Sequence, residues 1–103
     1  MANYRTLSES EIQSALQGLK DWSLAGGKLQ AAFAFASFRD AVAFLVRVAF
    51  EAEAMDHHPE LRNVYNRVWF SLSTHDAGDR VTDRDLELAR RISAAARGVA
   101  RAG

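Results

Sequence analysis

The longest regular pattern in the chain, from Ser37 to about His57, limits its possible folds more than any other feature. Apolar residues recur there three and four residues apart, which places them on one face of an α-helix: Phe38, Ala41, Val42, Leu45, Val48, Ala49 and Ala52. Ser37 has the side chain of a helix N-cap, with Asp40 in the reciprocal position. The helix ends by about His57, because Pro59 steers its predecessor out of α geometry. One broad apolar face needs a second layer to cover it.

A hairpin pattern precedes this helix. The segments Trp22–Ala25 and Lys28–Phe35 flank Gly26 and Gly27, and two glycines readily adopt the positive φ angles that a two-residue hairpin turn requires. Apolar and polar residues alternate within the second segment. One face of that strand is therefore predicted to be buried, the face that carries Leu29, Ala31, Phe33 and Phe35.

The pattern after the helix also indicates strands. A single strand from Leu61 to Thr74 would be unusually long. Tyr65-Asn66 offers a break, since Asn tolerates the left-handed conformation of a turn, so we predict strands over Leu61–Val64 and Arg67–Thr74. Alternation then divides the second strand between the helix-covered core (Val68, Phe70 and Leu72) and the opposite face (Trp69, Ser71, Ser73 and His75).

A capping box starts each of the two remaining helices. Ser8 with Glu11 opens the first, which should stop around Lys20, and Thr82 with Asp85 opens the last. The last helix has a stripe to bury, made of Leu86, Ala89, Ile92 and Ala96. The order α-β-β-α-β-β-α predicts an α+β fold, with three helices packed on one face of a four-stranded antiparallel sheet, in a single domain over residues 1–103.

Composition excludes several classes of protein. The chain has 13 basic and 13 acidic residues, so no overall charge favours a nucleic acid or a membrane as a partner. No run of about 18 apolar residues indicates a membrane span. The chain contains no cysteine, which excludes disulfides and thiolate chemistry. A reducing cytoplasm is therefore the default location, although other compartments are compatible with the same composition.

The three histidines concentrate the potential chemistry of the chain. His57 and His58 stand side by side before Pro59, and His75 lies where the last strand ends and a side chain can face a pocket. Glu53 is four residues before His57, so the two can touch on one helical face. Histidine titrates near pH ~6.5 and can give or take a proton at neutral pH. Three converging histidines would suit a reaction that needs both an acid and a base.

Other interpretations of these residues stay open at this point. Adjacent histidines at a helix end can be plain polar surface. Metal binding is an alternative, but we expect no functional metal, because no standard zinc spacing is present among the candidate ligands Asp56, His57, His58 and His75. Three aromatic residues could stack on a flat ligand, or serve packing or subunit contact instead: Trp22, Tyr65 and Trp69.

Three segments together resemble one known family. They read AEAMDHHPE at residues 52–60, NVYNRV at 63–68 and LSTHD at 72–76. This combination of His-His-Pro, Tyr-Asn-x-Val and Ser-Thr-His is similar to the pterin-4a-carbinolamine dehydratases, and the resemblance extends over nearly the whole chain. It implies an α+β fold with helices against a four-stranded antiparallel sheet, the same architecture that the patterns above predict.

The resemblance also implies an activity and its residues. Members of this family are hydro-lyases that eliminate water from 4a-hydroxytetrahydropterin to give quinonoid dihydropterin, as in tetrahydrobiopterin recycling, and need no metal or other cofactor. Carried over by position, His57 and His75 would be the acid/base pair, and His58 would hold the pterin. Glu53 and Asp85 match acidic positions of the family's motif and would support the site.

The resemblance leaves an alternative function and one departure. Animal members of the family also act as dimerisation cofactors of a homeodomain transcription factor, so a protein-binding module without catalysis is the alternative. Many members have two glycines in the loop after Ser-Thr-His, followed by an apolar residue. This chain reads Gly78-Asp79-Arg80-Val81 there, which affects the shape and charge expected of the loop.

We also expect self-association, as a homodimer or a homotetramer. Trp69 is predicted on the sheet face that the helices leave open. Phe44, Val46 and Phe50 add apolar surface to the main helix beyond what one buried stripe requires. A second copy of the chain is the expected cover for these residues.

Overall fold

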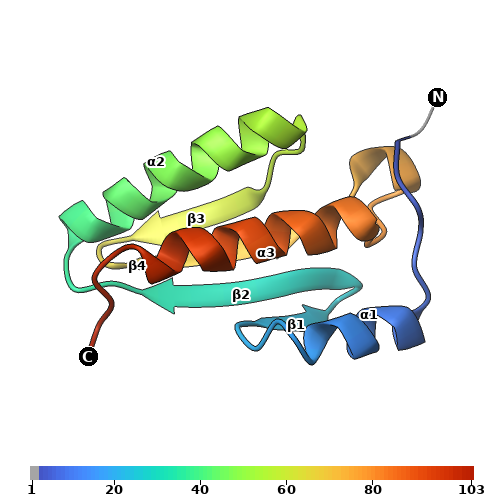
Figure 1. Cartoon of the computed structure of the whole chain (residues 1–103), viewed down its shortest axis with the longest axis horizontal. Coiled ribbons are helices and arrows are strands. Elements are labelled where there is room, and N and C mark those ends of the chain that lie inside the picture. The colour runs from blue at the N-terminus through green and yellow to red at the C-terminus, as the bar shows by residue number, and fades with distance from the viewer. Residues whose placement is uncertain (1–2) are drawn as a thin grey trace.

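The computed structural model describes residues 3–103 and has the predicted order of elements (Figure 1). The elements are α1 (Glu9–Leu16), β1 (Trp22–Ala25), β2 (Lys28–Ala34), α2 (Phe38–Met55), β3 (Glu60–Val64), β4 (Arg67–Leu72), the 3-10 helix η1 (His75–Ala77) and α3 (Asp83–Arg97). The strands form one antiparallel sheet in the order β1-β2-β4-β3, so the two hairpins meet through their second strands. The three helices lie on one face of it, which confirms the predicted α+β fold.

The connection of these elements brings distant parts of the sequence to one end of the molecule. Helices α2 and α3 lie side by side and run in opposite directions, so α2 ends where α3 begins (Figure 1). Strand β4 runs antiparallel to β2. It ends near the end of α2 and the start of α3, and η1 follows it there. The predicted histidine segments, one after α2 and one after β4, are therefore neighbours in space.

An aromatic cluster forms the centre of the core, and it corrects one expectation. Phe44 has no exposed surface and packs against Phe35 with the ring centroids 4.6 Å apart, whereas we expected it to add apolar surface outside the buried stripe. The reason is that α2 packs against both the sheet and α3, which turns its buried face toward Ala41, Phe44, Val48 and Ala52. Phe38 and Val42 of the predicted stripe are consequently 51% and 39% exposed.

Other differences from the predicted pattern are local. Helix α1 keeps its capping box but ends at Leu16 rather than near Lys20. In the β3–β4 turn the left-handed residue is Tyr65, with φ 52°, and not Asn66. The Asn66 side chain instead donates a hydrogen bond to the carbonyl of Phe35, 2.9 Å away. A turn residue thus ties the second hairpin to the end of β2.

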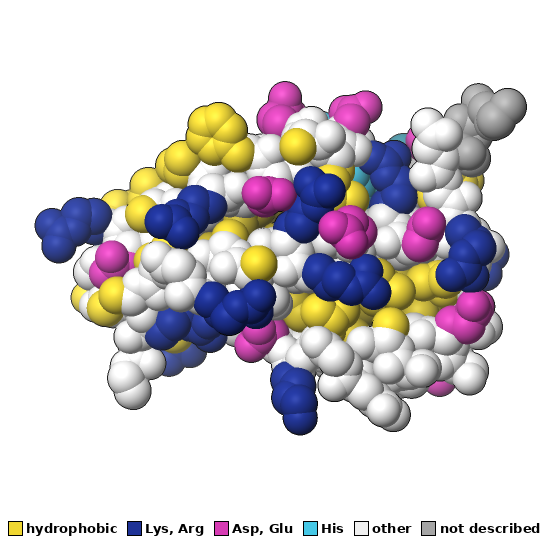
Figure 2. All heavy atoms as spheres, in the orientation of Figure 1, with side chains coloured by type: hydrophobic (Ala, Val, Ile, Leu, Met, Phe, Trp, Pro, Cys, Tyr) yellow, Lys and Arg dark blue, Asp and Glu magenta, His cyan; other side chains and the backbone are white. Residues whose placement is uncertain are grey.

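The face that carries α2 and α3 has charges of both signs and an apolar edge. Figure 2 shows basic and acidic side chains interspersed over the two helices. Hydrophobic side chains gather along the outer edge of α2 in the same view. Within residues 3–103, no helix is long and apolar enough to cross a membrane.

Candidate active site

All three histidines line one pocket at the end of the molecule where α2, β4 and α3 meet. Its volume is about 400 Å³. The walls come from the residues after α2, the end of β4 with η1, the start of α3 and the N-terminal segment: Asp56, His57, His58, Ser73, Thr74, His75, Asp76, Arg84, Asn3 and Tyr4. The sequence predicted the histidines here, and the structure adds polar neighbours from two further segments.

His57 reaches this pocket because α2 ends in a left-handed turn. Asp56 adopts φ 50° and ψ 45° after the last helical residue. The N–H of Asp56 donates to the carbonyl of Glu53 and the N–H of His57 to that of Ala52, both at 3.1 Å, which is the hydrogen-bond pattern of a Schellman motif. The motif takes His57 off the face of the helix. Its side chain then lies against the start of α3, 9% exposed.

A buried carboxylate holds the His57 ring. Nε2 of His57 lies 2.6 Å from Oδ1 of Asp85, which has no exposed surface. Oδ2 of Asp85 accepts from the backbone N–H of Thr82 at 2.8 Å and from the hydroxyl of Thr74 at 2.9 Å. Asp85 is therefore both the capping-box residue that the sequence predicted and the partner of His57.

The carboxylate of Asp85 decides which ring nitrogen of His57 carries the proton. The hydroxyl of Thr74 has one hydrogen, which it donates to Oδ2 of Asp85. The hydroxyl of Thr82 is therefore the donor in its 2.6 Å contact with the hydroxyl of Thr74. A carboxylate only accepts hydrogen bonds, so with Asp85 as a carboxylate the Nε2–H of His57 donates to Oδ1. Within residues 3–103 no buried side-chain nitrogen or oxygen lacks a partner, so this network is complete. Among the described residues, the other ring nitrogen, Nδ1, has no hydrogen-bond partner, and His57 lines the pocket.

His58 and Glu53 form a second and more exposed pair, which corrects an expectation. Glu53 contacts His58 and not His57: the distance from Oε1 to Nε2 of His58 is 2.6 Å. The helical spacing that favoured His57 does not continue past Met55, because the left-handed Asp56 reverses the chain and brings His58 back over Glu53. The side chains are 58% and 77% exposed, so the pair contributes at most about 1 kcal/mol to folding.

His75 has few contacts of its own. It opens η1 and its side chain is 94% exposed, with Nδ1 3.4 Å from Oδ1 of Asp79. Gly78 and Asp79 both adopt positive φ, 73° and 62°. This is the stretch where the sequence departs from the two glycines of many family members, and the second left-handed position is occupied by Asp79. The departure therefore leaves the loop folded and puts a carboxylate beside His75.

Comparison with known proteins identifies the family of the chain. The sequence profile of the family described as Pterin 4 alpha carbinolamine dehydratase matches residues 5–95. The chain belongs to this family. A relative from Opitutus terrae is 53% identical over 84% of this chain and 89% of its own length, and one from Solibacter usitatus is 50% identical over 89% and 96%. Both are provisionally named pterin-4-alpha-carbinolamine dehydratase, a hydro-lyase activity.

A solved structure has the same fold. The crystal structure of the transcriptional coactivator/pterin dehydratase from Brucella melitensis superposes with a TM-score of 0.84 and shares 39% sequence identity. The match covers 89% of this chain and 99% of the Brucella chain.

Three residues that form hydrogen bonds at the histidine pocket were not predicted from the sequence. Arg84 donates to the carbonyls of Met55 and Asp56 (3.1 Å for Asp56), so it ties the start of α3 to the end of α2. Thr74 holds Asp85, and Tyr4 reaches the His75 loop. Thr74 lies inside the Ser-Thr-His motif and could have been inferred from it. Arg84 and Tyr4 act over long sequence separations, and no periodic pattern marks them.

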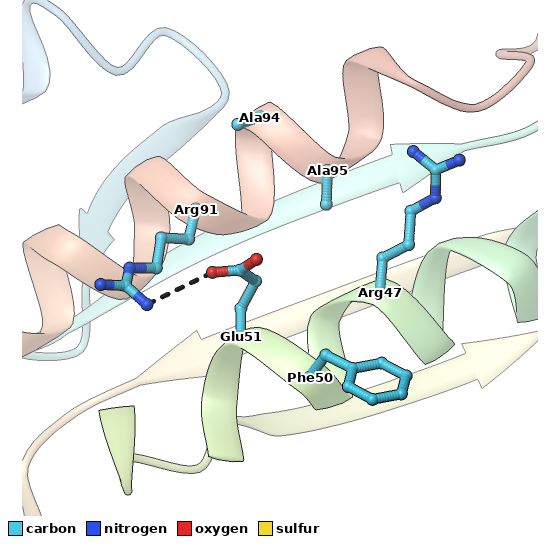
Figure 3. A pocket seen from close by; sticks show the side chains of 6 residues that line it. All are labelled: Arg47, Phe50, Glu51, Arg91, Ala94 and Ala95. Atoms are coloured by element: carbon cyan, nitrogen blue, oxygen red, sulfur yellow. Dashed lines mark hydrogen bonds and ion pairs between the residues drawn. The ribbon is translucent and has the colours of Figure 1, made fainter. Parts of the chain in front are cut away.

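A larger pocket between α2 and α3 carries no comparable chemistry (Figure 3). Its volume is about 480 Å³, and it is lined by Arg47, Phe50, Glu51, Arg91, Ala94 and Ala95. Arg91 donates to Glu51 at 3.3 Å and to Glu87 at 3.0 Å, and the hydrogen bond with Glu87 is the main cause that raises the pKa of Arg91. The ring of Phe50 points away from α3 and is 74% exposed. Of the described residues, no histidine lines this pocket, whereas all three histidines line the other one, so the histidine pocket is the candidate active site.

The described part of the chain offers no evident metal centre. In residues 3–103, no group of three or more His, Asp or Glu side chains is arranged to hold a metal ion. The expectation that the activity needs no metal stays a prediction.

Proposed function

We propose that this chain catalyses the dehydration of 4a-hydroxytetrahydropterin to quinonoid dihydropterin, and so takes part in tetrahydrobiopterin recycling. The observation that carries the proposal is the His57–Asp85 pair, buried at the wall of a pocket that the other two histidines also line. Membership of the dehydratase family supports the same reaction. The cytoplasmic location expected from the composition is part of this proposal.

The reaction needs one proton given and one taken. The C4a–O bond breaks as the hydroxyl leaves as water, the N5–H proton departs, and its electron pair forms the C4a–N5 double bond. We assign the two proton transfers to His57 and His75. His57 is the base: Nε2–H is held by Asp85, so Nδ1 takes the N5 proton and the carboxylate stabilises the resulting imidazolium. His75, beside the Asp79 carboxylate, is the acid that protonates the leaving hydroxyl.

His58 has a different part in the proposal. Its Nε2 contacts the exposed Glu53, so the pair presents a polar edge at the mouth of the pocket. We assign His58 to holding the pterin. An alanine in place of His58 should raise KM more than it lowers kcat, because it removes binding rather than a proton-transfer group.

The assembly that we propose is a homodimer or homotetramer through the outer face of α2. Exposed apolar side chains continue from that helix to β3: Phe38 at 51%, Val46 at 51%, Phe50 at 74% and Leu61 at 42%. Trp69 contributes less than expected, because it is half-buried and Arg62 lies 4.0 Å from its ring centroid. Replacing Val46 and Phe50 by lysine should give a folded monomer by light scattering. An unchanged mass would show that self-association, if present, uses another surface.

The Brucella protein is named a transcriptional coactivator/pterin dehydratase, which suggests coactivation through protein binding as a second function. A protein-binding module needs an exposed apolar surface such as the outer face of α2. It has no use for a fully buried Asp85 that orients a histidine at a pocket wall. We therefore place the dehydratase activity first.

The test is stopped-flow dehydration of freshly prepared 4a-carbinolamine by the purified protein. We expect catalysis well above the solution rate, unchanged after treatment with EDTA. A rate equal to that of buffer alone contradicts the proposed reaction. Loss of turnover on removing stoichiometric metal would contradict the acid/base mechanism while keeping the reaction.

A further inference from the structure

The N-terminal segment is fixed against the start of α3 beside the active site. The N–H of Arg5 donates to Oδ1 of Asp83 at 2.7 Å, and the N–H of Asp83 donates back to the carbonyl of Arg5 at 3.1 Å. Thr6 forms an antiparallel bridge with Thr82. These contacts immediately follow Tyr4, so the position of Tyr4 is set by backbone pairing.

Tyr4 spans from this segment to the loop that carries His75. Its hydroxyl donates to the carbonyl of Asp76 at 3.0 Å, the residue after His75 in η1. The backbone hydrogen bonds of Ala77, Gly78 and Asp79 close within the loop, onto Thr74 or His75. Among the described residues, Tyr4 therefore provides the one hydrogen bond from a distant segment to residues 75–79.

The His75 loop needs such an anchor. The His75 side chain is 94% exposed and its one contact, with Asp79, is 3.4 Å long, so packing does not set its position. The loop also contains two consecutive left-handed residues, one of which is not glycine. Backbone of this kind persists only where surrounding contacts hold it. The position of the His75 side chain consequently depends on where the backbone of the loop is held.

We propose that Tyr4 is a positioning residue for His75 and a wall of the substrate site. Its hydroxyl holds the loop so that the imidazole faces the pocket, and its ring, which lines the same pocket, borders the flat pterin. This inference rests on the proposed function for its kinetic part. Its structural part, the anchoring of the loop, can be tested without any activity.

The kinetic test is a double-mutant cycle between Tyr4 and His75. Tyr4→Phe keeps the ring and removes one neutral hydrogen bond, so we expect kcat to fall about 3–10-fold with little change in KM. In a His75→Ala background the same substitution should have no effect, because the group that it positions is gone. Tyr4→Ala also removes the wall and should raise KM. Tyr65→Phe is the matched control and should leave both constants unchanged, because Tyr65 lies at the exposed β3–β4 turn and does not line the histidine pocket.

The second arm measures the loop directly. Amide hydrogen exchange of Gly78 and Asp79, whose N–H groups are bonded within the loop, should become about 3–10-fold faster in Tyr4→Phe while the thermal midpoint stays unchanged. Unchanged exchange overturns the anchoring role. An equal loss of kcat with and without His75 shows that Tyr4 acts independently of that residue, and also overturns the inference. A wild type without dehydratase activity would defeat the proposed function, and faster exchange would still support the anchor.

Discussion

Replacement of Asp85 by asparagine tests the atomic arrangement of the site most closely. The aspartate accepts from three groups, His57, Thr74 and the N–H of Thr82, and it has no exposed surface. Asparagine has the same shape but one accepting oxygen and one NH2 donor. If the oxygen keeps the cap at Thr82, the NH2 faces His57 and donates to Nε2. The ring must then carry its proton on Nδ1, and the base is lost.

The size of the effect follows from these contacts. Loss of a general base typically costs about 10²–10⁴-fold in rate, so kcat for Asp85→Asn should fall into that range. With the cap retained, the stability cost is that of one altered buried pair, about 1–3 kcal/mol, or a fall in Tm of roughly 4–8 °C for each kcal/mol. Asp40→Asn changes an aspartate in the capping turn of α2, away from the pocket, and should leave kcat unchanged.

Two measurements check this prediction. Stopped-flow dehydration gives kcat, and circular dichroism on the same sample establishes that the variant is folded. Nitrogen-15 NMR should find the proton of His57 on Nε2 in the wild type and on Nδ1 in the variant. A folded Asp85→Asn protein within threefold of wild-type kcat would refute the reasoning, as would a wild-type His57 that carries its proton on Nδ1 alone.

Two smaller predictions concern individual side chains. The N–H of Ser8 and then the side chain of Arg5 lower the pKa of Glu11, so its stabilising effect should be present above about pH 4.5 and lost as pH falls through the lowered value. Glu11→Gln should accordingly lower Tm at pH 7 and leave it unchanged near pH 2. Asp79→Gly relieves a left-handed aspartate and should stabilise the fold by about 1 kcal/mol, while removal of the carboxylate beside His75 lowers kcat. An unchanged or lower Tm for Asp79→Gly would contradict the strain at that position.

The fold could be predicted from the sequence because its signals are local. Glycine pairs, capping residues and the two periodicities are sufficient to place four strands and three helices in order. The buried side of α2 could not be placed as well. Its packing against both α3 and the sheet moved Phe44 into the core and Phe38 to the surface, which depends on contacts across the fold and not on spacing within the helix.

The sequence predicted that the three histidines lie together but not how they pair with carboxylates. Helical spacing favoured Glu53 with His57, whereas the left-handed Asp56 exchanged the partners. Asp85 entered through the resemblance and its capping position, and its contact with His57 spans 28 residues. The hydrogen bond from Tyr4 to Asp76 spans 72 residues and leaves no trace in the sequence pattern.

The central claim is that His57 and His75 carry the two proton transfers, and the double variant His57→Ala/His75→Ala tests it most directly. Each single variant should lose a large part of the turnover, about 10²–10⁴-fold, because one proton-transfer group remains. The double variant, checked for folding by circular dichroism because His57 also holds Asp85, should dehydrate freshly made 4a-carbinolamine at the solution rate in stopped flow. A folded double variant that keeps most of the wild-type rate would contradict the proposed mechanism.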